Sequence, residues 1–253
     1  MATPQDTLMT AWQGIIAVVA VFLFVIAYNR YRIKKTGIAS TLAVTLMYMA
    51  LAMAFQFIGQ LMSINDVDVG DHLWSGGNPF WMASWLLMLV RSFQVAYFFL
   101  VLGLFMLHRF ALQLSPDNPR KITRDRIALG MAIVVIAFGV IKVQFPIADL
   151  DEIGSILYQV DIWVIVFGLF MVIPVLSIAY HMYSRIQPGT VEQRRLRCMV
   201  LMGWILLVMI TLLVLDAILS TIGLPDTSYW ARFAGFGSAM VGLVFVYLSF
   251  YAK

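Results

Sequence analysis

Charged residues are scarce in this sequence: Asp, Glu, Lys and Arg make up only 12% of its 253 residues, whereas 62% are hydrophobic. A soluble globular domain contains about 25% charged residues. With so few polar side chains, the chain cannot cover its own surface in water, which excludes an ordinary soluble fold. We therefore expect residues 1–253 to form a single integral membrane domain.

Cysteine and histidine are also rare. Cys198 is the only cysteine, so no disulfide can form within the chain. The three histidines cannot share a zinc ion, because His72 is expected on the opposite side of the membrane from His108 and His181. The latter two end different predicted spans at the same surface, where they could jointly hold a haem or a metal ion. We favour the interpretation that His108 and His181 are solvated residues at the membrane interface, and we expect no cofactor.

Catalytic motifs are missing as well. The sequence contains no P-loop, dinucleotide fingerprint, CxxC or HExxH pattern. Ser238, in the segment GFGSAM, lacks a histidine in the same half of the expected bundle that could act as its base. These missing catalytic motifs predict a protein that is not an enzyme.

A signal peptide is also missing from the N-terminus. The first ten residues lack the basic region of such a peptide, so we expect the first span to be retained.

Long apolar runs are what the sequence has instead. A transmembrane helix needs roughly 20 apolar residues, and seven stretches approach or exceed this length. They cover residues 11–28, 38–63, 81–108, 127–147, 159–183, 196–223 and 229–251. The expected fold is therefore all-α, a polytopic seven-transmembrane-helix bundle. In architecture it is similar to the seven-helix input modules of some prokaryotic sensor proteins, which implies a sensor-like role.

The basic residues predict the orientation of this bundle. Residues 29–37, 108–126 and 183–197 hold most of the lysines and arginines, whereas the intervening loops carry aspartate and glutamate instead. The positive-inside rule then places the N-terminus outside and the C-terminus in the cytoplasm. This pattern accounts for the net charge of +4 without a nucleic-acid partner. We expect the basic loops to contact anionic lipid or a cytoplasmic output protein.

Polar side chains within the spans lie mainly in the expected outer half of the bundle. Long polar side chains in hydrocarbon face the bundle interior and pair there. Charge matching pairs Arg91 with Asp216, either as a structural clamp or as part of a binding site. The residues that we expect to form a ligand-binding site are Arg91, Gln94, Asp216, Gln56 and Gln60.

Other polar residues lie nearer the ends of the spans. Lys142 and Asp161 are expected to form a structural ion pair between two neighbouring spans. Arg232 is close enough to the outer surface for its side chain to reach water. Small residues recur at every fourth position of the last span, and this spacing predicts close helix packing, either within the bundle or against a partner. They are Ala234, Ser238 and Gly242.

These observations predict a non-enzymatic, receptor-like or sensor-like protein of the cell membrane, with a polar ligand site in the outer half of its bundle. An accessory subunit of a larger membrane complex is the main alternative, because the loops are short and the last span has small-residue faces. A transporter or channel is the third possibility. The nearly apolar inner half of the spans counts against it, since it offers no polar path.

Overall fold

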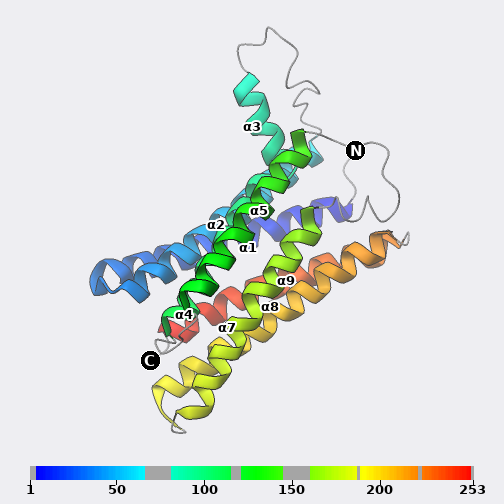
Figure 1. Cartoon of the computed structure of the whole chain (residues 1–253). Helices are drawn as coiled ribbons and strands as arrows, with labels where there is room; N and C mark the ends of the chain where they lie inside the picture. The colour runs from blue at the N-terminus through cyan, green and yellow to red at the C-terminus, as the bar shows by residue number, and fades with distance from the viewer. Residues whose placement is uncertain are drawn as a thin grey trace.

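The structure is a computed structural model that describes residues 4–65, 81–114, 121–144, 160–186, 189–221 and 224–251. Within these ranges every regular element is an α-helix (Figure 1). The helices are α1 (Pro4–Lys34), α2 (Gly37–Ile64), α3 (Trp81–Arg91), α4 (Gln94–Leu114), α5 (Lys121–Gln144), α7 (Val160–Arg185), α8 (Val191–Thr221) and α9 (Pro225–Tyr251).

Six of these helices are long and apolar enough to cross a membrane: α1, α2, α4, α7, α8 and α9. They identify the chain as an integral membrane protein. The stretch expected at 127–147 lies largely in α5, whose first turns carry Lys121, Arg124, Asp125 and Arg126, and its last three residues lie outside the described ranges. The all-helical class is therefore confirmed, whereas the count of seven spans stays a prediction.

The stretch predicted as one span at 81–108 is two helices. α3 ends at Arg91 and α4 begins at Gln94, and Phe93 between them has a φ of 62°, in the left-handed region. The Phe93 N–H donates to the carbonyl of Val90 at 3.1 Å, and the Ser92 hydroxyl donates to the carbonyl of Met88 at 2.8 Å. These bonds close the last turn of α3, and Figure 1 shows α3 leaning away from the other helices.

Gly59 of α2 explains why the break is accommodated at this position. A Cβ atom at Gly59 would lie 2.6 Å from the carbonyl oxygen of Val90 and 3.0 Å from the ring of Phe93. Only glycine lets the backbone of α2 approach the break so closely. The interruption of the third span therefore depends on tertiary packing against α2 as well as on its own sequence.

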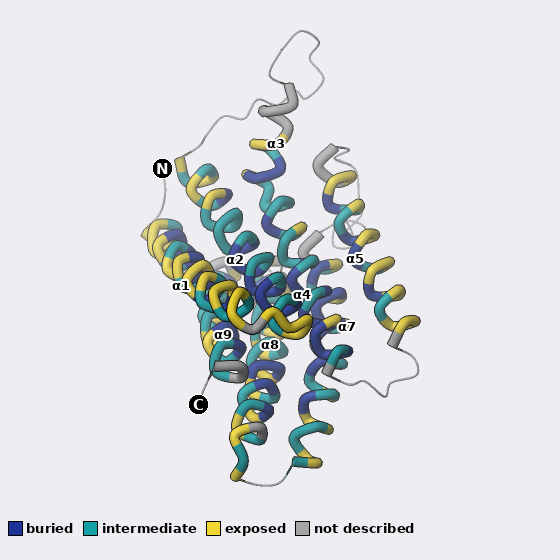
Figure 2. The backbone as a smooth tube through the Cα atoms, turned by 90° about the vertical axis from the view of Figure 1, so that its left-hand side faces the viewer, coloured by how far each residue is buried: buried dark blue, intermediate teal, exposed yellow. Residues whose placement is uncertain are grey.

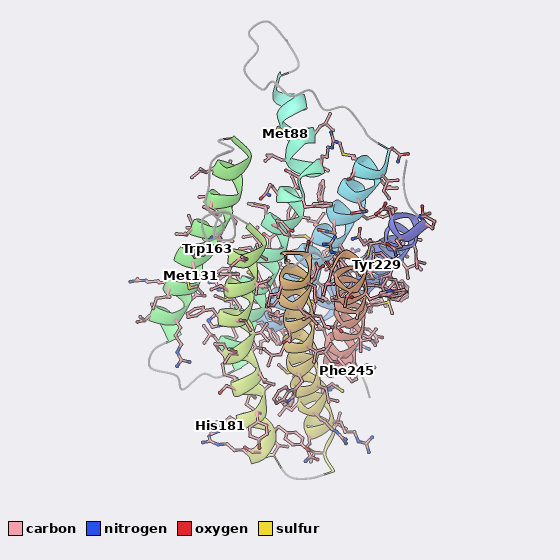
Figure 3. The ribbon with its side chains drawn as sticks, turned by 90° about the vertical axis from the view of Figure 1, so that its right-hand side faces the viewer. Met88, Met131, Trp163, His181, Tyr229 and Phe245 are labelled. Carbon is pink, nitrogen blue, oxygen red and sulfur yellow. The ribbon has the colours of Figure 1, made fainter. Side chains whose placement is uncertain are left out.

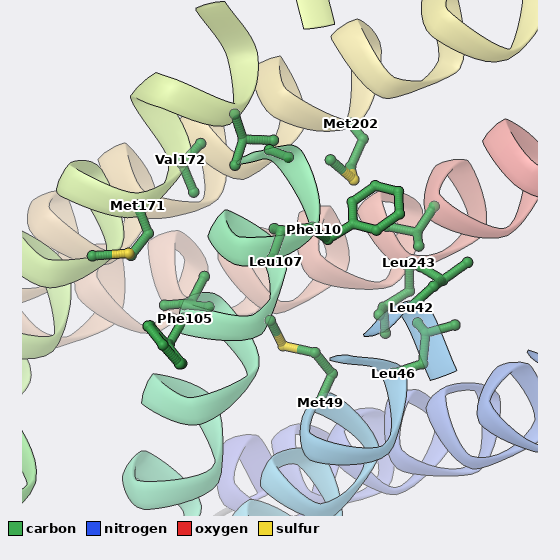
Figure 4. Packing of buried hydrophobic residues seen from close by; sticks show 14 of the residues in the cluster. Leu42, Leu46, Met49, Phe105, Leu107, Phe110, Met171, Val172, Met202 and Leu243 are labelled. Carbon is green, nitrogen blue, oxygen red and sulfur yellow. The ribbon is translucent and has the colours of Figure 1, made fainter. Parts of the chain in front are cut away.

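α4 is the central helix of the bundle. Of its most apolar 18-residue segment 56% is buried, against 22–39% for the other five membrane-long helices. Figure 2 shows the same contrast, with α4 largely buried and α1 and α5 exposing one side. Leu107 and Phe110 of α4 pack with Met49 of α2, Met202 of α8 and Leu243 of α9 (Figure 4). This apolar core fills the half of the bundle toward the C-terminus of α4.

The helix ends form two groups in Figure 1. Toward one end of the molecule lie the α1–α2 turn, the C-terminal ends of α4, α7 and α9, and the start of α8. We call this the basic end, because the basic segments predicted above lie there. The start of α1, the end of α2 and the α8–α9 connection lie at the opposite end, which we call the acidic end. This arrangement places Gln56, Gln60 and Asp216 at similar heights.

Candidate functional site

A cavity of about 580 Å³ lies between the helices in the half of the bundle nearer the acidic end. Each of the six membrane-long helices contributes residues to its wall, so the cavity depends on how all six helices pack. Its volume falls within the range of about 300–1,000 Å³ that is usual for small-molecule sites. Its polar lining residues are Gln13, Gln56, Gln60, Tyr97, Asp216, Ser220 and Arg232. Of the five predicted ligand-binding residues, Gln56, Gln60 and Asp216 therefore meet here.

Asp216 is paired with Arg232 instead of Arg91. The Nε of Arg232 donates to Oδ2 of Asp216 at 2.8 Å, and its Nη2 donates to Oδ1 at 3.3 Å. Oδ1 also accepts a hydrogen bond from the hydroxyl of Ser228. The predicted Arg91–Asp216 pair is therefore wrong. Asp216 lies in the last turns of α8 and Arg232 lies near the start of α9, so the two side chains are neighbours by topology.

Arg91 and Gln94 lie outside this cavity because of the break between α3 and α4. Arg91 is exposed at the end of α3 and lines neither of the two cavities. The Nε2 of Gln94 donates to the carbonyl of Ser92 at 3.2 Å. Gln94 also borders a second, mainly apolar cavity of about 220 Å³ beside α5. The two residues would share a face of a continuous helix, and the break removes that relationship.

Gln13 of α1 is a cavity residue that the sequence reading missed. Its side chain is only 3% exposed, and its Oε1 has no hydrogen-bond partner within the described structure. The first span was predicted to begin at residue 11, and Gln13 was not among the predicted site residues. Because α1 begins at Pro4, Gln13 lies about 14 Å along the helix, at ~1.5 Å per residue. A glutamine among apolar residues was the available signal.

Lys142 and Asp161 remain a prediction. Both residues belong to described helices, but their side chains lie outside the described part of the structure.

The three small residues of the predicted stripe on α9 differ in burial: Gly242 is buried, Ser238 is half-buried and Ala234 is exposed. Gly242 lies against Ile205 of α8, with 3.5 Å between its ideal Cβ position and the Cγ2 atom. The Ser238 hydroxyl donates to the carbonyl of Ala234 at 3.0 Å, within the same helix. Ala234 itself is exposed. The structure therefore places one member of this stripe on α8 and leaves another on the outer surface.

His108 and His181 do not meet. His108 is 1% exposed and lies beside the backbone of Met171, and neither of its ring nitrogens has a hydrogen-bond partner in the described structure. His181 is exposed, ten residues beyond Met171 on α7, which is about 15 Å along the axis. Figure 3 shows it at the opposite end of α7 from Trp163. The described residues therefore do not place the two histidines around a common haem or metal ion.

The chemistry offered by the cavity is hydrogen bonding. Carboxamides from Gln13, Gln56 and Gln60 can each donate and accept, and the Asp216–Arg232 pair supplies a fixed dipole. Among the described residues no group of three or more His, Cys, Asp or Glu side chains could hold a metal ion. Compared with models of known protein families and with curated protein sequences, the chain matches none of them significantly.

Proposed function

We propose that this chain is a non-enzymatic, receptor-like or sensor-like membrane protein that holds a small polar ligand in the cavity between its six membrane-long helices. The observation that carries the proposal is the cavity of about 580 Å³, whose wall holds the carboxamides of Gln13, Gln56 and Gln60 beside the Asp216–Arg232 pair. Carboxamides both donate and accept hydrogen bonds, so they can pair with the polar groups of a small molecule.

The proposed orientation follows from the charges at the two ends of the bundle. The cavity lies in the half of the bundle that faces away from the C-terminal ends of α1, α4 and α7, next to which the basic segments of the sequence lie. If these helix ends face the cytoplasm, as the positive-inside rule predicts, the cavity is on the outer side of the cell membrane. The basic end would then contact anionic lipid or a separate output protein.

Ligand binding can be tested by thermal unfolding of the purified protein in lipid nanodiscs, screened against a library of small polar metabolites. The variants Gln13→Leu and Gln56→Leu remove amides from the cavity. Gln113→Leu is the matched control, because Gln113 also has a buried, unpaired Oε1 but lines neither cavity. We expect compounds that raise the Tm of the wild type and of Gln113→Leu, but not of the two cavity variants.

A binding protein should also release its ligand chemically unchanged, which mass spectrometry of the recovered compound would show. The proposal fails if no compound raises the Tm of the wild type while both cavity variants unfold at higher temperature. That result would mean that the amides are structural and destabilising. A compound recovered in altered form would instead show that the protein is an enzyme.

Transport is a second candidate, favoured by one observation. The third span is broken beside the cavity, and Phe93 at the break lines its wall. Interrupted helices next to a central site are typical of secondary transporters. The apolar core around Leu107 and Phe110 counts against a continuous polar path in this conformation. Ligand-dependent uptake into proteoliposomes would decide in favour of transport, and binding without uptake would decide against it.

A role as an accessory subunit is favoured by α3. Among the described elements this helix packs mainly against α2 and α4, and its Leu86 and Leu87 are 54% and 46% exposed. An apolar surface on a helix that leaves the bundle (Figure 1) is suited to contact another membrane subunit. Native mass analysis after gentle extraction would reveal such a partner. A lone chain or a homo-oligomer would count against this role.

A further inference from the structure

We infer that the cavity selects an uncharged organic molecule that carries hydrogen-bonding groups at one end and an apolar body at the other. This inference rests on the proposed function, namely that the cavity holds a ligand. It adds the chemical class of that ligand, and three properties of the wall define it: its balance of charge, its amides and its aromatic lining.

The charge of the wall is balanced before any ligand binds. Among the described lining residues, Asp216 supplies a carboxylate and Arg232 a guanidinium, and the two are joined by two hydrogen bonds. Both carboxylate oxygens are occupied, because Oδ1 also accepts from Ser228. A ligand with a net charge would therefore enter a low-dielectric site without a counter-ion, which is strongly unfavourable. Displacing one partner of the pair would leave the other charge uncompensated.

The amides of the wall determine how the polar end of the ligand is held. Gln13 on α1 lines the cavity, and Gln56 and Gln60 are half-buried one turn apart on α2. A carboxamide offers an oxygen acceptor and two N–H donors. The polar end of the ligand can therefore pair with these amides without carrying a charge.

The rest of the wall is apolar and partly aromatic. Phe93, Tyr97 and Phe236 contribute rings, and Leu100 and Leu213 contribute aliphatic side chains. Such a surface is favourable for a hydrocarbon or ring face and gives little to a small hydrophilic ion. A molecule with an uncharged polar head and an apolar body therefore matches both parts of the wall.

Matched probes can test the ligand class directly. Benzamide, benzoate and benzylammonium share a ring and differ mainly in the charge of the head group, and the naphthyl analogues extend the same series. Their affinities would be measured on the protein in nanodiscs, at constant pH and ionic strength, for the wild type, Gln13→Leu and Gln113→Leu. We expect the carboxamides to bind about tenfold or more tightly than either charged partner, because only they avoid burying a charge. Gln13→Leu should abolish this preference, and Gln113→Leu should retain it.

The possible outcomes separate this inference from the proposed function. If a carboxylate or ammonium binds more tightly than the carboxamide, and Gln13→Leu weakens it, the cavity is a binding site but the ligand class is wrong. If no member of any series binds to wild-type protein that shows a cooperative unfolding transition, the proposed function fails and the inference fails with it. Equal binding by all variants would place the probes in the surrounding lipid and would likewise overturn the inference.

Discussion

The ion pair between Asp216 and Arg232 gives the sharpest test of the site geometry. The Asp216 side chain is 12% exposed and accepts from Arg232 through both oxygens, whereas the Arg232 side chain is 49% exposed. Removing one partner of a fully buried pair costs about 3–5 kcal/mol. Because about half of the Arg232 side chain is exposed, we expect a smaller loss of about 2 kcal/mol for Arg232→Met, mostly from leaving the Asp216 carboxylate uncompensated.

A double-mutant cycle isolates this interaction from the other effects of each substitution. Asp216→Asn should destabilise the wild type by about 1 kcal/mol, because it removes the charged acceptor of Arg232. In the Arg232→Met background the same substitution should be neutral or stabilising, because it removes the uncompensated charge. The cycle therefore predicts a coupling free energy of about 1–2 kcal/mol between the two positions.

The measurement is equilibrium unfolding in a single detergent, followed by the helical circular dichroism signal. Arg91→Met is the matched control, because Arg91 is exposed at the end of α3 and lines neither cavity. It should combine additively with Asp216→Asn. Coupling of Arg91 to Asp216 as strong as that of Arg232, or a loss below about 0.5 kcal/mol for Arg232→Met, would refute the reasoning.

Three further substitutions test other parts of the fold by the same unfolding measurement. Gly59→Ala should lower the free energy of unfolding by about 2 kcal/mol, because the new Cβ would clash with the backbone of the break between α3 and α4. Gly130→Ala should not destabilise the protein, because no atom lies within 4 Å of its Cβ position, and equal effects would contradict the packing of α2 on the break. His108→Leu should stabilise by about 1 kcal/mol, because it removes a buried ring without hydrogen-bond partners, and a clear loss of stability would mean that the ring does bond to the neighbouring backbone of Met171. Ser228→Ala should cost about 1 kcal/mol by removing a donor to Asp216, and a neutral effect would mean that this hydrogen bond contributes little.

The apolar runs predicted where the helices are but not where they end. The first span was expected to begin at residue 11, whereas α1 begins at Pro4, and the sixth was expected at 196, whereas α8 begins at Val191. The terminal turns of these helices contain polar residues, so they are not counted in an apolar run although they are helical. Hydrophobicity therefore reports the part of a helix suited to the membrane interior and leaves out its polar extensions.

The break in the third span could not be predicted from its own residues. The segment that connects Arg91 to Gln94 contains neither proline nor glycine, and its flanking residues are strongly apolar. The enabling residue is Gly59, more than 30 positions earlier, where the missing Cβ admits the carbonyl of Val90. A single sequence gives no sign that these two segments touch, so a continuous helix was the expected result.

Depth within the membrane was a partial guide to which residues share the site, because it also selected Arg91 and Gln94, which do not line the cavity, and charge matching was a poor guide. Gln56, Gln60 and Asp216 were grouped because they lie at similar heights, and all three line the cavity. Charge matching then assigned Asp216 to Arg91, the arginine deepest in its predicted span. However, two helices joined by a short connection must lie side by side, whereas opposite charges on distant helices need not be close. Asp216 and Arg232 flank the short α8–α9 connection at similar depths, so proximity along the hairpin was the better physical criterion for the partner of Asp216.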